Sequence, residues 1–184
     1  MTSSLPLAWF VARAAGLVAF ALLTLAVWAG LAMSTRLLGP KHQKTLLGLH
    51  RTLTWTGLGM VGLHVGAVLL DPVLHFGAAA ALVPFAAPWK PGAIAAGVVA
   101  GWLSLLLAVS FRARKWIGQK TWRRLHYASF AAFALSLGHA LWTGTDLKGV
   151  GGPLLALVAA GPVLWLTFYR LLSPRVRAAV PAPA

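Results

Sequence analysis

Five long apolar stretches dominate this chain of 184 residues and restrict what it can fold into. Each stretch is close to the roughly 20 residues that a helix needs to cross the hydrocarbon core of a bilayer. Because lipid offers no hydrogen bonds to the backbone, apolar segments of this length must be helical. The sequence therefore predicts an all-α integral membrane bundle of about five transmembrane helices, over residues 14–33, 46–70, 92–111, 124–143 and 153–172.

The scarcity of charge supports the same conclusion. Only 10% of the residues are charged, against about 25% in a typical soluble domain, so they cannot cover a water-exposed surface. The sequence predicts one membrane domain over residues 1–184, with a short cytoplasmic tail at 173–184. The segment before the first apolar run, 1–11, carries no basic residue, so we interpret that run as a retained helix and not as a signal peptide.

The net charge of +14 reflects membrane topology and not a nucleic-acid partner. Basic residues gather in the short loops after the first, third and fifth apolar runs, where the positive-inside rule places them. On the opposite side we expect Arg13, Lys90 and Lys148, together with both acids, Asp71 and Asp146. We expect a multi-pass protein of the plasma or inner membrane, with an outer N-terminus, a cytoplasmic C-terminus and basic loops that contact lipid head groups.

The chain contains no cysteine, which excludes several kinds of centre. Disulfides, thiolate metal sites and iron–sulfur clusters all need cysteine sulfur. Covalent c-type haem attachment needs a C-x-x-C-H motif, so any haem on this chain must be bound without a covalent link.

Four histidines within two of the predicted helices are the candidate ligands. His50 and His64 lie 14 residues apart in 46–70, and His126 and His139 lie 13 apart in 124–143. At a helical rise of 1.5 Å per residue, each spacing separates two levels by roughly 20 Å. The two helices are predicted to run parallel, so His50 shares the cytoplasmic level with His126 and His64 shares the outer level with His139.

These facing pairs predict two stacked b-type haems, each with two axial imidazoles. Helical bundles commonly bind cofactors between facing helices, and imidazole is a good ligand for iron. A single zinc ion bound by all four histidines is excluded, because zinc ligands lie about 2 Å from the metal. The remaining histidines, His42 and His75, are predicted to be surface residues in loops.

The angular spacing of the second pair is less regular. At 100° per residue, 14 positions fall only about 40° short of four turns, but 13 positions fall about 140° short. An ideal helix would therefore direct His126 and His139 to different faces. We expect a local distortion of this helix, which Gly138 can ease.

Arg51, Arg123 and Arg124 are the candidate partners of the inner haem propionates, because they lie near its predicted level. An equally good interpretation is that they are anchors at the cytoplasmic membrane surface.

At these residues the sequence resembles the ferric reductase-like transmembrane domain family. That family includes the membrane core of ferric reductases and NADPH oxidases and the haem subunit of periplasmic methionine sulfoxide reductase systems. The resemblance covers about residues 36–172, and the matching segments are LHRTLTWTGLGMVGLH and WRRLHYASFAAFALSLGH, with their unequal histidine spacings. It implies bis-histidine ligation of haem b and electron flow from the cytoplasmic to the outer face.

The chain departs from this family in two ways. Many members have six helices, whereas this sequence predicts five. The oxidases and reductases carry a cytoplasmic flavin- and NADPH-binding domain, whereas this chain shows no flavin or NADPH site. We therefore expect the electron donor to be a separate flavoprotein or quinol, and the outer acceptor to be Fe³⁺, oxygen or a periplasmic oxidoreductase.

Two other functions remain open from the sequence. One is a quinol-oxidising cytochrome b subunit of a dehydrogenase or hydrogenase complex. The other, of a different class, is a non-redox membrane scaffold or a carrier of protons or metal ions that uses the histidines as relays. With only two acids, both near the outer ends of helices, a proton path is poorly furnished.

Overall fold

The computed structural model describes residues 7–72, 76–145 and 147–173 of the chain. These residues form helices and no strand, so the predicted all-helical class is confirmed. The elements in chain order are α1 (Leu7–Thr35), η1 (Pro40–His42), α2 (Gln43–Leu69), α3 (Ala78–Leu82), α4 (Pro91–Ile117), α5 (Gln119–His126), α6 (Ala128–Thr143) and α7 (Gly151–Leu172).

Four helices among the described residues are long and apolar enough to cross a membrane, as a multi-pass membrane protein requires. They are α1, α2 with the preceding η1, α4 and α7. The fifth predicted span, 124–143, is divided at Tyr127 into the end of α5 and the 16-residue α6. The count of about five crossings therefore stays a prediction, and His75, Asp146 and the tail beyond residue 173 lie outside the described residues.

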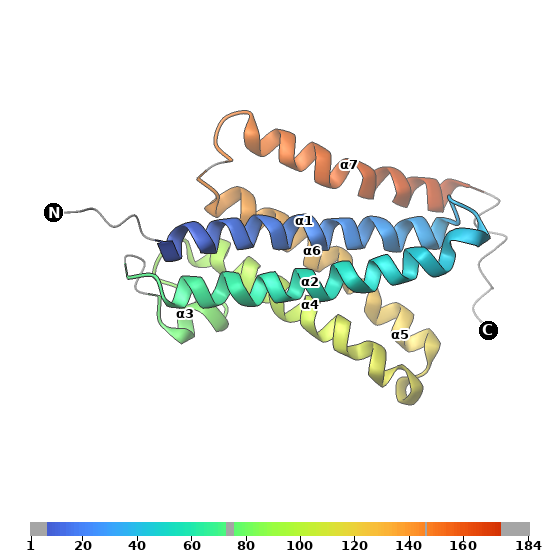
Figure 1. The fold of residues 1–184 in the computed structure, drawn as a ribbon, viewed down its shortest axis with the longest axis horizontal. Helices are drawn as coiled ribbons and strands as arrows, with labels where there is room; N and C mark the ends of the chain where they lie inside the picture. Colours follow the sequence, from blue (N-terminus) through green and yellow to red (C-terminus); the bar gives the residue numbers. More distant parts are fainter. Residues whose placement is uncertain (1–6, 73–75, 146, 174–184) are drawn as a thin grey trace.

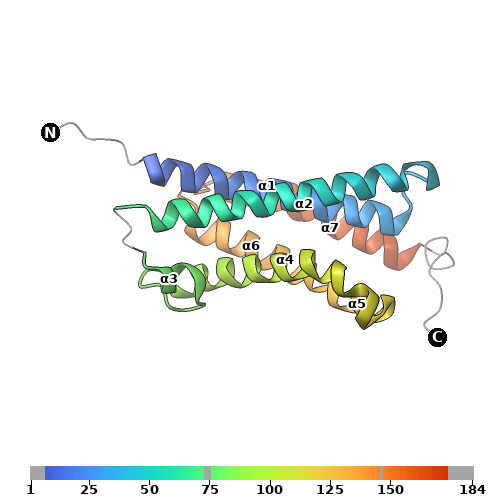
Figure 2. The same cartoon turned by 60° about the horizontal axis from the view of Figure 1, so that its bottom comes forward.

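Two antiparallel helix pairs form the bundle. Figures 1 and 2 show α1 running alongside α2, and α4 alongside α6, while α7 packs against α1. The buried residues of α1 are largely alanines, and small side chains let neighbouring helix backbones approach closely in a membrane. The short α3 and its flanking loops cover one end, where Phe76, Ala80 and Ala87 are buried against Val68 and Ile94.

The two pairs meet at several points along the bundle. A Cβ atom added at Gly101 of α4 would lie 3.8 Å from Val61 of α2, which is ordinary van der Waals contact. Phe20 of α1 stacks on Phe133 of α6, with ring centroids 6.2 Å apart and an interplanar angle of 20°. The stack of Phe20 on Phe133 joins the pairs between the two histidine levels.

The helix directions sort the charges between the two ends. Arg13, Lys90 and Lys148 lie at the end that holds α3 and the start of α1. The opposite end holds the η1–α2 and α4–α5 connections, with the other described basic residues: Arg36, Lys41, Lys44, Arg51, Arg112, Arg114, Lys115, Lys120, Arg123, Arg124 and Arg170. The predicted separation of charge is therefore present in the fold.

A tryptophan joins α7 to the rest of the bundle. The indole N–H of Trp28 in α1 donates a hydrogen bond to the carbonyl oxygen of Ala159 in α7, at 3.2 Å. Trp28 also packs against the buried cluster of Leu31, Val163 and Leu166.

We predict that Trp28→Phe lowers the free energy of unfolding by about 1 kcal/mol, because it removes the hydrogen bond and keeps most of the aromatic packing. Thermal unfolding in detergent measures this change. The matched control is Trp142→Phe, which replaces an indole that is 65% exposed. Equal effects of the two substitutions would contradict a specific α1–α7 link.

Candidate functional site

The structure places the four candidate histidines in two facing pairs. His50 of α2 lies opposite His126 at the end of α5, with ring centroids 6.2 Å apart and planes 68° apart. His64 of α2 lies opposite His139 of α6, again with centroids 6.2 Å apart and planes at 81°. Each pair therefore joins α2 to the α5–α6 segment, and the two pairs lie at different levels of the bundle.

Three of these rings are oriented by backbone carbonyls of a neighbouring helix. The Nδ1 atoms of His50 and His64 lie 2.7 Å from the carbonyl oxygens of Ala26 and Ala12 in α1. Nδ1 of His139 lies 2.9 Å from the carbonyl oxygen of Ala93 in α4. A carbonyl oxygen can only accept, so Nδ1 carries the proton and donates in each case. The lone pair of each neutral ring is therefore on Nε2, which is then available to a metal ion.

Each of these carbonyls is followed, four residues later, by a glycine that leaves room for the ring. A Cβ atom at Gly16 would lie 2.9 Å from Nδ1 of His64, and one at Gly30 would lie 3.6 Å from His50. At Gly97 the added atom would lie 2.6 Å from Nδ1 of His139. We call each combination of alanine carbonyl and glycine a histidine cradle: Ala12 with Gly16, Ala26 with Gly30, and Ala93 with Gly97.

The fourth ring, His126, has a different environment. Its Nδ1 atom is buried and has no hydrogen-bond partner among the described residues. The ring stacks on Trp122 of the same helix, with centroids 4.9 Å apart and an angle of 27°. Trp122 in turn packs edge to face on Phe111 of α4, at 5.7 Å between centroids.

A helix break after His126 offsets part of the angular shortfall of the 13-residue spacing. The backbone N–H of Tyr127 bonds to the carbonyl oxygen of Arg124, and that of Phe130 bonds to Tyr127, both three residues back. Such tighter hydrogen bonds turn the chain by more than 100° per residue. The expected distortion is thus present at Tyr127, whereas α6 continues as a helix through Gly138.

The separation of the paired rings fits a metal ion between them. Two imidazole nitrogens at about 2.0 Å from one ion place their ring centroids about 6 Å apart, close to the 6.2 Å found at both levels. Among the described residues, no group of three or more histidine, cysteine, aspartate or glutamate side chains gathers as a metal site. Two imidazoles alone do not complete a tetrahedral zinc site, but they do complete the axial positions of a haem iron.

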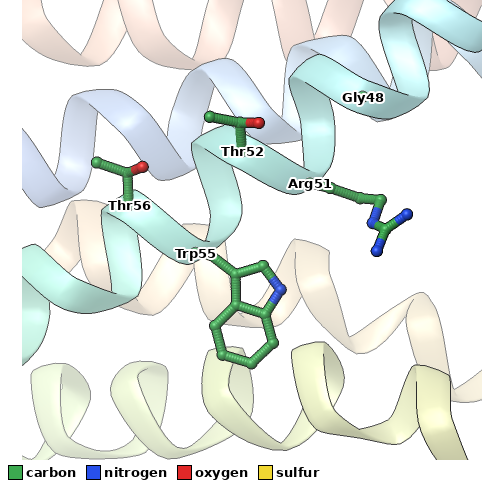
Figure 3. A pocket seen from close by; sticks show the side chains of 5 residues that line it. All are labelled: Gly48, Arg51, Thr52, Trp55 and Thr56. Atoms are coloured by element: carbon green, nitrogen blue, oxygen red, sulfur yellow. The ribbon is translucent and has the colours of Figure 1, made fainter.

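An open pocket of about 480 Å³ lies beside the level of His50. It is lined by Gly48, Arg51, Thr52, Trp55 and Thr56, all on α2. Figure 3 shows the indole of Trp55 directed toward α4, with the guanidinium of Arg51 extended along the same side of α2. The pocket therefore combines one cation with two hydroxyl groups and an aromatic ring, a set that suits an anionic or hydrogen-bonding ligand.

The other sequence-predicted residues lie apart from the facing rings. Arg123 and Arg124 are exposed on α5, in the turn before His126. His42 is exposed and its Nδ1 lies 2.6 Å from the carbonyl oxygen of Leu38 in its own loop, consistent with a surface role.

Sequence reasoning missed the histidine cradles, although the sequence contains a signal for them. Gly16 and Gly30 in α1 are 14 residues apart, the same spacing as His64 and His50 in the antiparallel α2. Because α1 and α2 are antiparallel and the two spacings are equal, Gly16 lies level with His64 and Gly30 lies level with His50.

In comparisons with known proteins, no family model, curated protein or solved structure matches the chain.

We predict that Gly97→Ala destabilises the protein by about 1–3 kcal/mol, the usual effect of inserting a methyl group into a packed interior. The added atom would lie 2.6 Å from the ring of His139, which must move away from the Ala93 carbonyl. The matched control is Gly101→Ala in the same helix, where the added atom has an ordinary contact. Thermal unfolding should show the control neutral or slightly stabilised, because alanine favours helix over glycine; similar losses in both variants would refute the cradle.

Proposed function

We propose that this protein is a membrane electron-transfer module that binds two b-type haems, one between His50 and His126 and one between His64 and His139. The observation that carries the proposal is the repeated facing of two imidazoles at 6.2 Å between ring centroids. An unrelated packing role for four histidines would not be expected to produce the same metal-compatible separation twice.

The arrangement of the chain supports this use of the rings. Haem bound at both levels would supply two one-electron Fe³⁺/Fe²⁺ couples, one near each side of the membrane. The cradles fix Nδ1 of His50, His64 and His139 against a helix carbonyl and aim Nε2 away from it. All four histidines are half-buried, and the helices separate the two levels by roughly 20 Å.

The distribution of charge supports an orientation in the membrane, and the family resemblance supplies the direction of transfer. The end that holds the His50–His126 pair also holds most of the basic residues, so we place it at the cytoplasmic face. The protein then lies in the plasma or inner membrane, with α5–α6 as a fifth crossing. In this orientation electrons enter from a cytoplasmic-side donor and leave to an acceptor outside.

Arg51 is the best-supported partner for a haem propionate. The chain has only two acids, and Asp71, at the far end of α2, is some 20 residues or roughly 30 Å from Arg51. Asp71 therefore does not neutralise the exposed guanidinium of Arg51, which can contact an external anion. A propionate of the inner haem, in or beside the pocket that Arg51 lines, provides one. Arg123 and Arg124 on α5 are the other candidates at this level.

Electron entry and exit depend on partners. The basic cytoplasmic end suits an acidic flavoprotein, because complementary charge accelerates association. Quinol within the membrane is the alternative donor, and Fe³⁺, oxygen or a periplasmic oxidoreductase is the acceptor.

A reduced-minus-oxidised visible spectrum of the purified protein, with the haem-to-protein ratio, tests the proposal. We predict a ratio of two in the wild type and of one in His64→Ala or His139→Ala, because each variant removes one axial ligand. The matched control is His42→Ala, an exposed histidine outside both pairs, which should keep both haems. The proposal would be wrong if the protein, expressed with an adequate supply of haem, is purified without haem.

We also predict that Arg51→Gln lowers the reduction potential of the inner haem by about 40 mV. This shift corresponds to the loss of roughly 1 kcal/mol of electrostatic stabilisation of the reduced state, for a one-electron couple. A nearby cation favours the reduced state, which carries one positive charge fewer. Redox titration measures the shift, and Lys44→Gln, an exposed residue nearer the start of α2, is the control. An unchanged potential in Arg51→Gln would remove Arg51 from the propionate site.

A further inference from the structure

The two histidine levels are built unequally. At the outer level both rings, His64 and His139, donate from Nδ1 to a helix carbonyl and rest over a glycine. At the inner level only His50 has such a cradle, while Nδ1 of His126 is buried without a partner among the described residues.

The sequence of α4 explains why the fourth cradle is missing. A step of 13 or 14 residues from Ala93 and Gly97 leads to Leu106 or Leu107 and to Ser110 or Phe111, so no glycine occupies the register. The hydroxyl of Ser110 donates to the carbonyl oxygen of Leu107 at 2.7 Å, which occupies an acceptor at this level.

Aromatic stacking takes the place of the carbonyl bond at His126. The ring stacks on Trp122, and Trp122 packs edge to face on Phe111. Stacking restrains the tilt of an imidazole, but the stacked ring offers no hydrogen-bond acceptor to Nδ1. The tautomer of the imidazole is therefore not fixed by this contact. By contrast, a carbonyl partner fixes the ring and makes Nε2 a stronger donor to a metal.

We propose that His126 is the displaceable ligand of the inner site, which therefore admits a small external ligand in place of this ring, whereas the outer site stays closed. The inference rests on the proposed function, since it concerns the rings as haem ligands. Loss of a partner that orients a metal-bound histidine typically costs 10- to 100-fold in metal affinity. We expect a small neutral ligand such as carbon monoxide to bind the reduced inner site 10- to 100-fold more tightly than the outer one.

Carbon monoxide titration of the reduced holoprotein, followed by its visible difference spectrum, tests this. In the wild type, half of the haem should respond at low carbon monoxide. His139→Ala protein that keeps only the inner His50–His126 site should bind carbon monoxide at that site with the wild-type affinity. Response of neither haem, or of both with equal affinity, would overturn the inference. Absence of haem would instead contradict the proposed function, so the two failures are distinguishable.

A second variant tests the stack without removing a ligand. Trp122→Leu should raise the carbon monoxide affinity of the inner site further, by up to roughly 10-fold, while the haem-to-protein ratio stays at two. The matched control is Trp116→Leu, because Trp116 is 75% exposed and lies outside the stack. An unchanged affinity in Trp122→Leu, or the same rise in both variants, would show that Trp122 does not position His126.

Discussion

Hydrogen bonds from imidazole Nδ1 to helix carbonyls are the interactions on which the arrangement of this bundle depends. A helix carbonyl already accepts one backbone bond, and its second lone pair is seldom used in a membrane, where polar side chains are scarce. His50 and His64 each use such a lone pair on α1, and His139 uses one on α4. Each bond fixes the contact between two helices and the direction of one ring at the same time. The same hydrogen bonds therefore determine both the helix packing and the geometry of the site.

Small residues make these bonds possible. The ring can reach the carbonyl at Ala93 only because position 97, one turn later, has no side chain, and the same relation holds at Gly16. Between the two levels, larger groups close the bundle instead, through the stacked rings of Phe20 and Phe133. Glycines at the histidine levels therefore make room for the imidazole rings, and aromatic packing closes the bundle between these levels.

Much of this organisation can be predicted from the sequence. The apolar runs fix the class and most helix positions within a few residues, because lipid leaves the backbone no alternative to helical hydrogen bonding. The equal rise of parallel helices also fixes which histidines share a level. By contrast, the break at Tyr127 depends on local hydrogen bonds three residues back, and no proline or glycine marks it in the sequence. The buried, unpartnered Nδ1 of His126 likewise follows from the packing of Phe111 and Trp122, which periodicity does not reveal.

The separation of the two levels bears on which kind of charge the chain can move. A proton relay needs titratable or hydrogen-bonding groups in near-continuous succession, and the levels are roughly 20 Å apart. Between them the helix pairs are joined by the Phe20–Phe133 stack, which cannot carry a proton. A metal carrier faces a related difficulty, because each level offers two imidazoles and no carboxylate or thiolate among the described residues to complete a site. A haem would need only the two imidazoles that each level provides, because its porphyrin supplies the other iron ligands. Electron transfer between the two levels would also need no chain of polar groups. The same sparse chemistry that disfavours ion transport therefore favours electron transfer.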